Sequence, residues 1–216
     1  MASQLEFDTI LHVLEKHLPP AGSVLDLAER GVYSSSLTQR GFRVVAPENA
    51  DVTRLDLLSD RNFQAVLCLG PYCGLRSRDQ RRRCLLECRR VLGDGGIVAL
   101  LYLNRAFALG LRLRDGVPLT ESQYRSLYLR LESDAEPVLD GAYLTSPEEV
   151  EAEVGSCGYQ VLDHVGADGI YDYFPDAFSQ LSAEAYQDFL WYHLRTCGQP
   201  SARGHSRHGL IILKKA

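Results

Sequence analysis

The stretch LLECRRVLGDGG at residues 85–96, followed by IVALLYL at residues 97–103, decides the fold of this chain. Apolar side chains recur with helical spacing between residues 79 and 92, which predicts an amphipathic helix. Glycines then turn the chain into the apolar run at 97–103, which is typical of a strand buried on both faces. A helix that leads through a tight turn into such a strand indicates a parallel α/β sheet.

The sequence on both sides of this stretch repeats the alternation of helix and strand. Short apolar strands are predicted at residues 23–27, 43–46, 63–69, 159–165 and 210–213. Helices are predicted at residues 5–18, 34–40, 183–195 and from Ser146 onward, where Pro147 takes the first helical position. We expect one domain over residues 1–216, with a helical cap insertion at about 105–145 over the carboxyl ends of the strands.

The composition argues against several classes of function. A net charge of -5 gives no general attraction to nucleic acid or to an anionic membrane, so neither is expected as a partner. The longest apolar run, residues 97–103, is too short to cross a bilayer. The first sixteen residues are acidic and amphipathic rather than a signal peptide, so a cytoplasmic location is expected.

Two groups of like residues leave alternatives open. Cys84 and Cys88 lie one helical turn apart and could form a metal or redox pair, or could be small apolar residues on a buried helix face. The six cysteines lack zinc-ligand spacing, and no metal is expected. An arginine-rich run is either a solvated helix face or a docking site for an acidic protein partner. It comprises Arg76, Arg78, Arg81, Arg82, Arg83, Arg89 and Arg90.

Three stretches together resemble the class I S-adenosylmethionine-dependent methyltransferases of small molecules. The most specific is residues 85–96, which are similar to the family's helix and glycine turn before the fifth strand. Residues 24–44 resemble its first strand, loop and helix, and residues 63–72 its fourth strand. The resemblance covers most of the chain. It implies a Rossmann-like α/β fold with a mostly parallel central sheet, helices on both faces and a small-molecule pocket at the carboxyl ends of the strands.

The sequence departs from this family where the cofactor would bind. The loop at residues 28–32 keeps only Gly31 of a glycine-rich loop whose backbone must approach the methionine part of the cofactor. Glu48 could bind the ribose, but too few residues follow it for the family's next helix and strand. Gln64 replaces a customary acid. We expect no cofactor; if S-adenosylmethionine still binds, Asp26, Gly31 and Glu48 are the expected contacts.

The resemblance also implies which residues face the substrate pocket. Substrate contacts are expected from Arg30, Tyr33, Asn104, Tyr171 and Arg203. Catalytic roles are expected for Tyr72, Arg105 and Asp172. The guanidinium of Arg105 could bind an anionic substrate group or form a structural salt bridge to the cap.

Each of two polar segments near the pocket has two possible interpretations. Residues 168–173, rich in acids and phenols, either supply a general base or form an ordinary exposed loop. The basic residues at 203–208 either form a pocket lip for anions or a solvated loop. His164, near a strand end, is expected to be a core histidine rather than a catalyst.

Three functions follow as hypotheses. The first is an enzyme of bacterial specialised metabolism that has lost cofactor use and closes a ring within an anionic substrate, small or carrier-tethered, for example forming an aziridine by displacing sulfate. Arg30 or Arg105 would steady the departing anion, and Asp172 or Tyr72 would take the amine proton. The alternatives are a genuine S-adenosylmethionine-dependent methyltransferase and a non-catalytic subunit that docks through the arginine-rich run.

Overall fold

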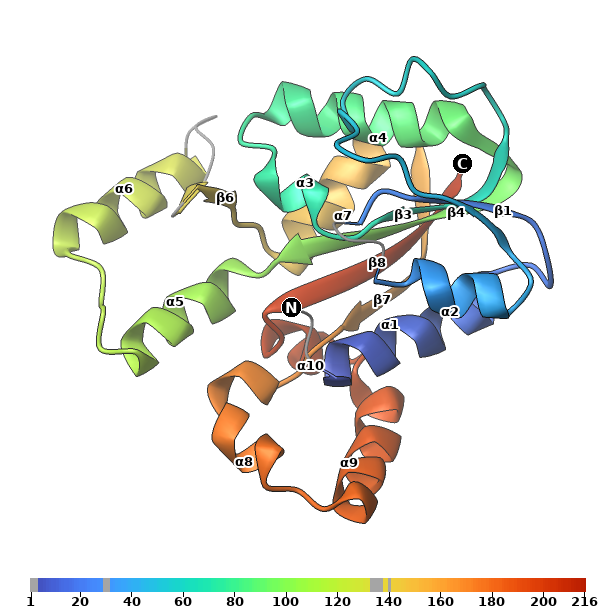
Figure 1. Cartoon of the computed structure of the whole chain (residues 1–216). Helices are drawn as coiled ribbons and strands as arrows, with labels where there is room; N and C mark the ends of the chain where they lie inside the picture. The colour runs from blue at the N-terminus through green and yellow to red at the C-terminus, as the bar shows by residue number, and fades with distance from the viewer. Residues whose placement is uncertain (1–3, 29–31, 133–137, 140) are drawn as a thin grey trace.

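The centre of this computed structural model is a six-stranded sheet with the order β2-β1-β3-β4-β8-β7 (Figure 1). The structure describes residues 4–28, 32–132, 138–139 and 141–216. β2, β1, β3 and β4 are parallel neighbours, and β8 runs antiparallel between β4 and β7. The strands are β1 (Ser23–Asp26), β2 (Arg43–Val45), β3 (Phe63–Cys68), β4 (Leu92–Leu103), β7 (Tyr159–Gly166) and β8 (His208–Lys215). The mostly parallel sheet confirms the predicted fold class.

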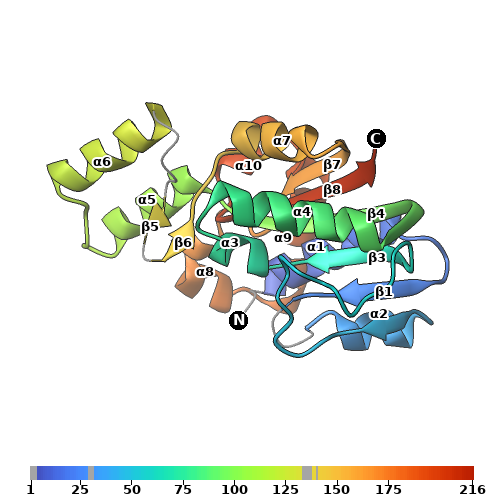
Figure 2. The ribbon, with the colours of Figure 1, turned by 90° about the horizontal axis from the view of Figure 1, so that it is seen from above.

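Helices cover both faces of the sheet, as predicted (Figures 1 and 2). The longer ones are α1 (Gln4–His17), α4 (Arg78–Val91), α5 (Arg105–Arg114), α6 (Glu121–Glu132), α7 (Pro147–Ser156) and α9 (Ala183–Thr196). The shorter ones are α2 (Ser34–Gln39), α3 (Pro71–Gly74), the 3-10 helix η2 (Tyr171–Tyr173), α8 (Pro175–Ser179) and α10 (Pro200–Gly204). No helix in the described part of the chain is long and apolar enough to span a bilayer.

The sheet separates two apolar cores. On one face, α3, α4 and α7 contribute side chains such as Tyr72, Leu85 and Val150, all of which are fully buried. On the other face, α1 and α2 contribute Leu14 and Leu37, which are also fully buried. Alternate side chains of each strand point to opposite faces, so the apolar strands supply both cores at once.

The glycine turn predicted at residues 93–96 lies inside β4, where it forms a bulge in the sheet. β4 begins at Leu92, earlier than the predicted strand, because Leu92 pairs with Phe63 and Ile97 pairs with Ala65. The residues between Leu92 and Ile97 therefore lie opposite Gln64 alone. A Cβ on Gly96 would lie 2.9 Å from the backbone oxygen of Gln64, so only glycine fits there without a shift of the backbone.

The segment between β2 and β3 contains turns and neither a helix nor a strand, which agrees with the prediction that it is too short. Val52 and Leu55 nevertheless bury their side chains in the core beneath α4. Arg90 holds the segment in place, because it donates to the backbone oxygens of Leu55 and Leu58, both at 2.9 Å. The carboxylate of Glu87 accepts from Arg90 and also from the backbone N–H of Leu55 at 2.8 Å.

The described part of residues 105–145 extends beyond the carboxyl end of β4 (Figure 1). It contains α5, α6 and a short hairpin of β5 (Val138–Leu139) and β6 (Ala142–Tyr143). Asn104 and Thr145 form a parallel bridge where this insertion leaves and rejoins the domain. The insertion therefore begins and ends at the edge of the sheet where the pocket is expected.

Candidate functional site

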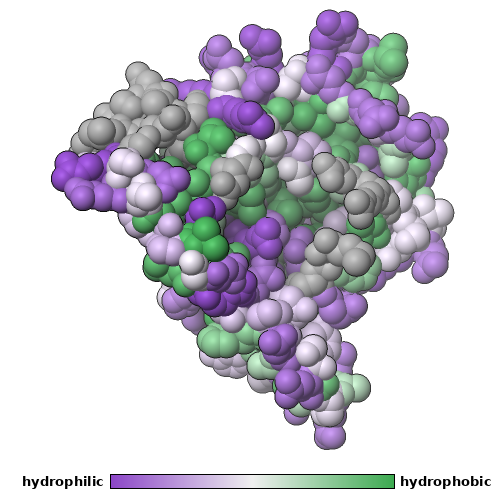
Figure 3. All heavy atoms as spheres, turned by 60° about the vertical axis from the view of Figure 1, so that its left-hand side comes forward, coloured by the Kyte–Doolittle hydropathy of each residue, from purple (hydrophilic) through white to green (hydrophobic). Residues whose placement is uncertain are grey.

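The carboxyl ends of β1, β3, β4 and β7 and the beginning of the antiparallel β8 meet at one edge of the sheet. Figure 3, which brings this side of the molecule forward, shows a hollowed surface where hydrophobic and hydrophilic residues both reach the floor. Open α/β sheets bind ligands at such an edge, because the loops there leave a crevice. This edge is the candidate site.

A buried cluster of two acids and a histidine lies at this edge. Nδ1 of His208, the first residue of β8, lies 2.7 Å from Asp168 Oδ2 and 3.4 Å from Glu6 Oε2. Asp168 also accepts the backbone N–H of His208, at 3.1 and 3.2 Å to its two oxygens. Glu6 is 6% exposed and Asp168 is 1% exposed, so both carboxylates are largely removed from water.

The two carboxylates keep the histidine charged. Burial alone would lower the pKa of His208, but the bonds to Asp168 and Glu6 outweigh it and raise this pKa to about 9. Burial raises the pKa of Asp168, and the hydrogen bonds from the ring and the backbone of His208 oppose that shift. Two acidic side chains thus lie against one basic side chain, an arrangement that suits a cationic group of a ligand.

Tyr33 places a second polar group beside the cluster. Its side chain is 3% exposed and stacks on Phe7 with ring centroids 5.4 Å apart. Its hydroxyl is buried and has no hydrogen-bond partner among the described residues. Burial, with the nearby carboxylates of Glu6 and Asp26, raises the pKa of Tyr33, so the hydroxyl keeps its proton. A buried hydroxyl without a partner is costly and is suited to donate to a ligand.

Asp26, at the end of β1, is occupied by its own loop. One carboxylate oxygen accepts the backbone N–H of Ala28 at 2.9 Å, and the other accepts the Ser34 hydroxyl at 2.6 Å. Burial raises the pKa of Asp26, and these two bonds oppose that shift. Asp26 therefore ties β1 to the start of α2. Arg30 and Gly31, the expected substrate and cofactor contacts in this loop, lie outside the described residues.

Two of the residues linked to cofactor binding lie apart from the cluster. Glu48 is exposed in a turn after the three-residue strand β2. Gln64 lies near the opposite end of the sheet, where its side-chain oxygen accepts the backbone N–H of Ser23 at 2.7 Å. Gln64 therefore secures the start of β1, and its difference from the family's acid does not bear on the edge where ligands bind.

Tyr72 belongs to a buried network beneath α4 rather than to the cluster. Its side chain is fully buried and donates to Glu153 at 2.6 Å. Glu153 also accepts from Arg81, and the Arg81 guanidinium lies 3.5 Å from the centre of the Tyr143 ring. Burial and the carboxylate of Glu153 raise the pKa of Tyr72 well above its ordinary value. Tyr72 is thus a hydrogen-bond donor within the core.

The polar residues that follow β4 bind the insertion to the domain. Arg105 forms two hydrogen bonds with the carboxylate of Glu149, at 2.8 and 2.9 Å; this is a structural salt bridge, but its partner lies on α7 rather than in the cap. The Asn104 side chain caps α5 through the N–H of Ala106 and donates to the backbone oxygen of Arg203. The guanidinium of Arg203 contacts a carboxylate oxygen of Glu151 at 3.0 Å. Asn104 and Arg105 therefore fix the start of the insertion, and Arg203 ties α10 to α7.

The remaining predicted residues lie on the segment after β7. Asp172 accepts from Arg207 at 2.9 Å, and its side chain is 22% exposed. The Tyr171 ring packs against Phe178 with centroids 5.0 Å apart. His164, expected to be a core histidine, is 6% exposed and shares a 2.8 Å hydrogen bond with the Tyr102 hydroxyl. The structure thus does not gather Asp172, Tyr72 and Arg105 at one point.

The arginine-rich run is largely engaged within the chain. Arg81 is 2% exposed, which departs from its expected place on a solvated face or docking surface. Arg89 donates to the backbone oxygen of Gly158, and Arg76 to that of Gly141. Arg82 and Arg83 are the two consecutive arginines that are exposed. The run mainly fastens α4 to neighbouring segments.

Sequence reasoning missed Glu6 and gave His208 no role of its own. Glu6 lies among the buried residues of α1, between Leu5 and Thr9, and this position was the available signal. An acid on an apolar helix face calls for a buried partner. That partner is more than 160 residues away in the chain, so helical periodicity could not identify it.

No known family model and no curated protein matches the sequence of this chain. Solved structures do match its fold. An S-adenosylmethionine-dependent methyltransferase from Archaeoglobus fulgidus is 12% identical with a TM-score of 0.57, over 99% of this chain and 95% of that one. The 1,6-didemethyltoxoflavin-N1-methyltransferase of Burkholderia thailandensis, solved with S-adenosylhomocysteine, is 13% identical with a TM-score of 0.55, over 99% and 79%.

A third similar structure has a different activity. The [4+2]-cyclase SpnF is 14% identical with a TM-score of 0.57, over 97% of this chain and 80% of that one. A cyclase is therefore found among the structures that share this architecture. The match of topology over nearly the whole chain shows that this protein has the fold of the class I S-adenosylmethionine-dependent methyltransferases.

Proposed function

We propose that this chain is an enzyme that uses the methyltransferase fold without S-adenosylmethionine and closes a ring within a small or carrier-tethered substrate. The ring closure is an internal substitution in which an amine of the substrate displaces an anionic leaving group. Formation of an aziridine with loss of sulfate is the example that we propose. The cyclase SpnF makes a ring-closing activity reasonable for this fold.

The observation that carries the proposal is that the sheet offers few residues where the adenosine of S-adenosylmethionine would bind. β2 has three residues, Glu48 after it is exposed, and the segment to β3 adds no further strand at the edge of the sheet. Asp26 already accepts two hydrogen bonds from its own loop. The described residues therefore do not fit the adenosine half of S-adenosylmethionine, and we derive no step through it.

The charge of the cluster supports an amine as the nucleophile. Two acids, Glu6 and Asp168, lie against the single imidazolium of His208, and this excess of acidic groups favours a substrate ammonium. In the proposed reaction Glu6 accepts a proton from the ammonium, and the lone pair of the resulting free amine bonds to the substrate carbon. The carbon–oxygen bond breaks, and its electron pair leaves with the sulfate. Alignment of these atoms in a closed site supplies much of the acceleration.

The departing sulfate needs a cation in this scheme. Arg105 is already paired with Glu149, so its guanidinium would have to leave that carboxylate in order to bind the departing sulfate. Arg30 therefore remains the better candidate for that role. Tyr33, with its buried and unpartnered hydroxyl, is the group that we expect to orient the substrate.

Thermal unfolding with S-adenosylhomocysteine and with S-adenosylmethionine tests the loss of cofactor use. A ligand at a hundredfold excess over its dissociation constant stabilises a protein by about 2.7 kcal/mol. For a chain of this length that corresponds to a rise in Tm of roughly 5–11 °C. We expect no rise at millimolar ligand, and a clear rise would overturn the proposal.

A genuine methyltransferase is the second candidate, because Asp26 keeps the acidic side chain at the end of the first strand. That candidate requires the cofactor to bind, so the same thermal measurement decides between the two. A methyl group transferred from labelled S-adenosylmethionine to an amine substrate would establish the second candidate directly.

A further inference from the structure

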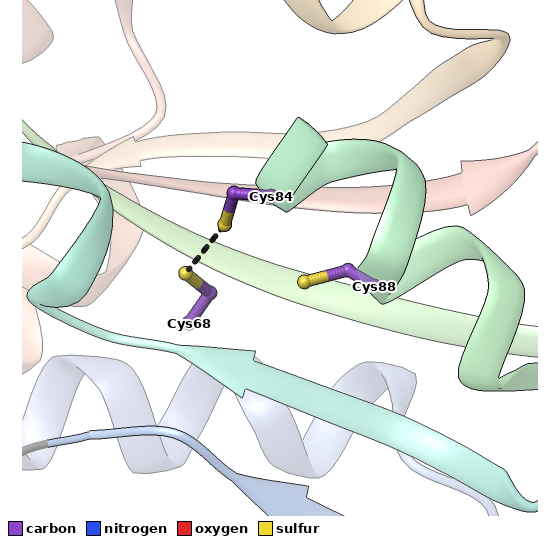
Figure 4. Close-up of side chains that lie close together, drawn as sticks. All are labelled: Cys68, Cys84 and Cys88. Carbon is purple, nitrogen blue, oxygen red and sulfur yellow. Dashed lines mark hydrogen bonds between the residues drawn. The ribbon is translucent and has the colours of Figure 1, made fainter. Parts of the chain in front are cut away.

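Three cysteines form a compact group inside the core beneath α4 (Figure 4). Cys68 is the last residue of β3, and Cys84 and Cys88 lie one turn apart on α4. All three are 0% exposed. The sulfur atoms of Cys68 and Cys84 are 3.8 Å apart, and all three sulfurs lie within 4.8 Å of one another.

This spacing is close to that of a three-coordinate metal thiolate. A metal–sulfur bond of about 2.3 Å places the corners of a trigonal plane about 4.0 Å apart. The Cys68–Cys84 pair is already near that separation, and no other pair has to close by more than about 0.8 Å. Rotation of cysteine side chains supplies movements of this size without a change in the backbone.

The donor set selects the kind of ion. Three sulfur donors favour a soft cation over magnesium, calcium or manganese. Structural zinc takes four ligands, and no histidine, aspartate or glutamate joins the three sulfurs in the part of the chain that the structure describes. A soft ion that accepts three sulfurs in a dry, apolar environment is copper(I).

The backbone around the group is already fixed before any ion binds. Ser77 and Gln80 form a capping box at the start of α4. Arg81 pairs with Glu153 near that end, and Arg90 clamps the other end to the segment after β2. Tyr159 donates to the backbone oxygen of Leu85, between the two helical cysteines, at 2.8 Å. The three sulfurs therefore do not have to be assembled from a flexible chain.

We propose that Cys68, Cys84 and Cys88 form a binding site for one copper(I) ion in the core beneath α4. The ion binds to three sulfurs, and each cysteine that ligates it does so as a thiolate and releases its proton to solvent. No oxidation or reduction is involved.

Copper(I) competition under oxygen-free conditions tests the site. The reduced, folded protein is titrated into copper(I) bicinchoninate, whose colour fades as the protein removes the ion. We expect one copper(I) per chain and X-ray absorption from three sulfurs at about 2.3 Å. Failure of the protein to withdraw copper, or a first shell that contains nitrogen or oxygen, would overturn the proposal.

Two substitutions make the test specific to these sulfurs. Cys84→Ala removes one donor and should weaken copper(I) binding by more than about 100-fold, the upper end of the effect of losing an outer-shell contact. Cys197→Ala removes a buried cysteine outside the group and should leave binding unchanged. Equal affinity in both variants would refute the assignment. If Cys84→Ala does not fold, the number of sulfurs around copper in the unaltered protein still decides.

Discussion

Replacing Asp168 with asparagine removes the shorter of the two carboxylate contacts to His208 while keeping the size of the side chain. The imidazolium then loses its main partner, and its pKa should fall toward the ordinary value. Because the histidine has a raised pKa in the folded protein, its contribution to stability is complete below the unfolded pKa and is lost as the pH rises through the folded pKa.

The magnitude follows from the two pKa values of His208. The folded value is about 9 and the unfolded value is about 6.5, a difference of about 2.5 units. At 1.36 kcal/mol per unit, the charged histidine contributes roughly 3 kcal/mol below pH 6.5 and nothing well above pH 9. Glu6 remains in the variant, so we expect Asp168→Asn to cost about 2 kcal/mol near pH 6 and about 1 kcal/mol or less near pH 10.

Urea unfolding of both proteins near pH 6 and near pH 10 measures this difference. Asp172→Asn is the matched control, because Asp172 pairs with an arginine whose charge does not change over this range. Its cost should be the same at both pH values. Histidine resonances give a second readout: one should titrate with a pKa of about 9 and be absent from a His208→Gln variant. An equal cost of Asp168→Asn at the two pH values, or no resonance titrating above pH 8, would refute the reasoning.

Two further predictions concern stability, with thermal or urea unfolding as the measurement for both. Glu153→Gln leaves a buried arginine without its carboxylate and should cost about 3–5 kcal/mol, whereas Glu121→Gln breaks an exposed pair and should cost less than about 0.5 kcal/mol. Similar losses of stability in the two variants would contradict the burial of the Arg81–Glu153 pair. Gly96→Ala places a Cβ 2.9 Å from a backbone oxygen and should cost about 1–3 kcal/mol, while Gly74→Ala, with open space around it, should change stability by less than about 0.5 kcal/mol. An unchanged free energy of unfolding in Gly96→Ala would show that the bulge can shift to make room for the methyl group.

Most of the sheet could be predicted because its signals are local. The apolar pattern of α4 and the strand at 97–103 can each be recognised within a short stretch of sequence, and the structure confirms both. The extension of β4 back to Leu92 was not predicted, because the glycines there suggested a free turn. Only the pairing of Leu92 with Phe63, a residue of another strand, draws that segment into the sheet.

The chemistry of the site was less accessible from sequence. Arg105 was recognised as a residue that needs a partner, and the two alternatives for it could not be separated until Glu149 was found beside it. Glu6 and His208 come from opposite ends of the chain, and their meeting depends on how α1 packs against the sheet. Charge pairs of this kind are set by tertiary structure, which residue type and local spacing do not encode.

The position of β8 has a consequence for the order in which the protein can fold during synthesis. This strand comes latest in the sequence of the sheet, yet it occupies an interior place between β4 and β7 and hydrogen-bonds to both. Until residue 215 has left the ribosome, β4 has an open edge and β7 has no neighbour in the sheet. His208, at the start of β8, also completes the charged cluster with Glu6 and Asp168. The nascent chain therefore acquires its full sheet and its candidate site in the same step.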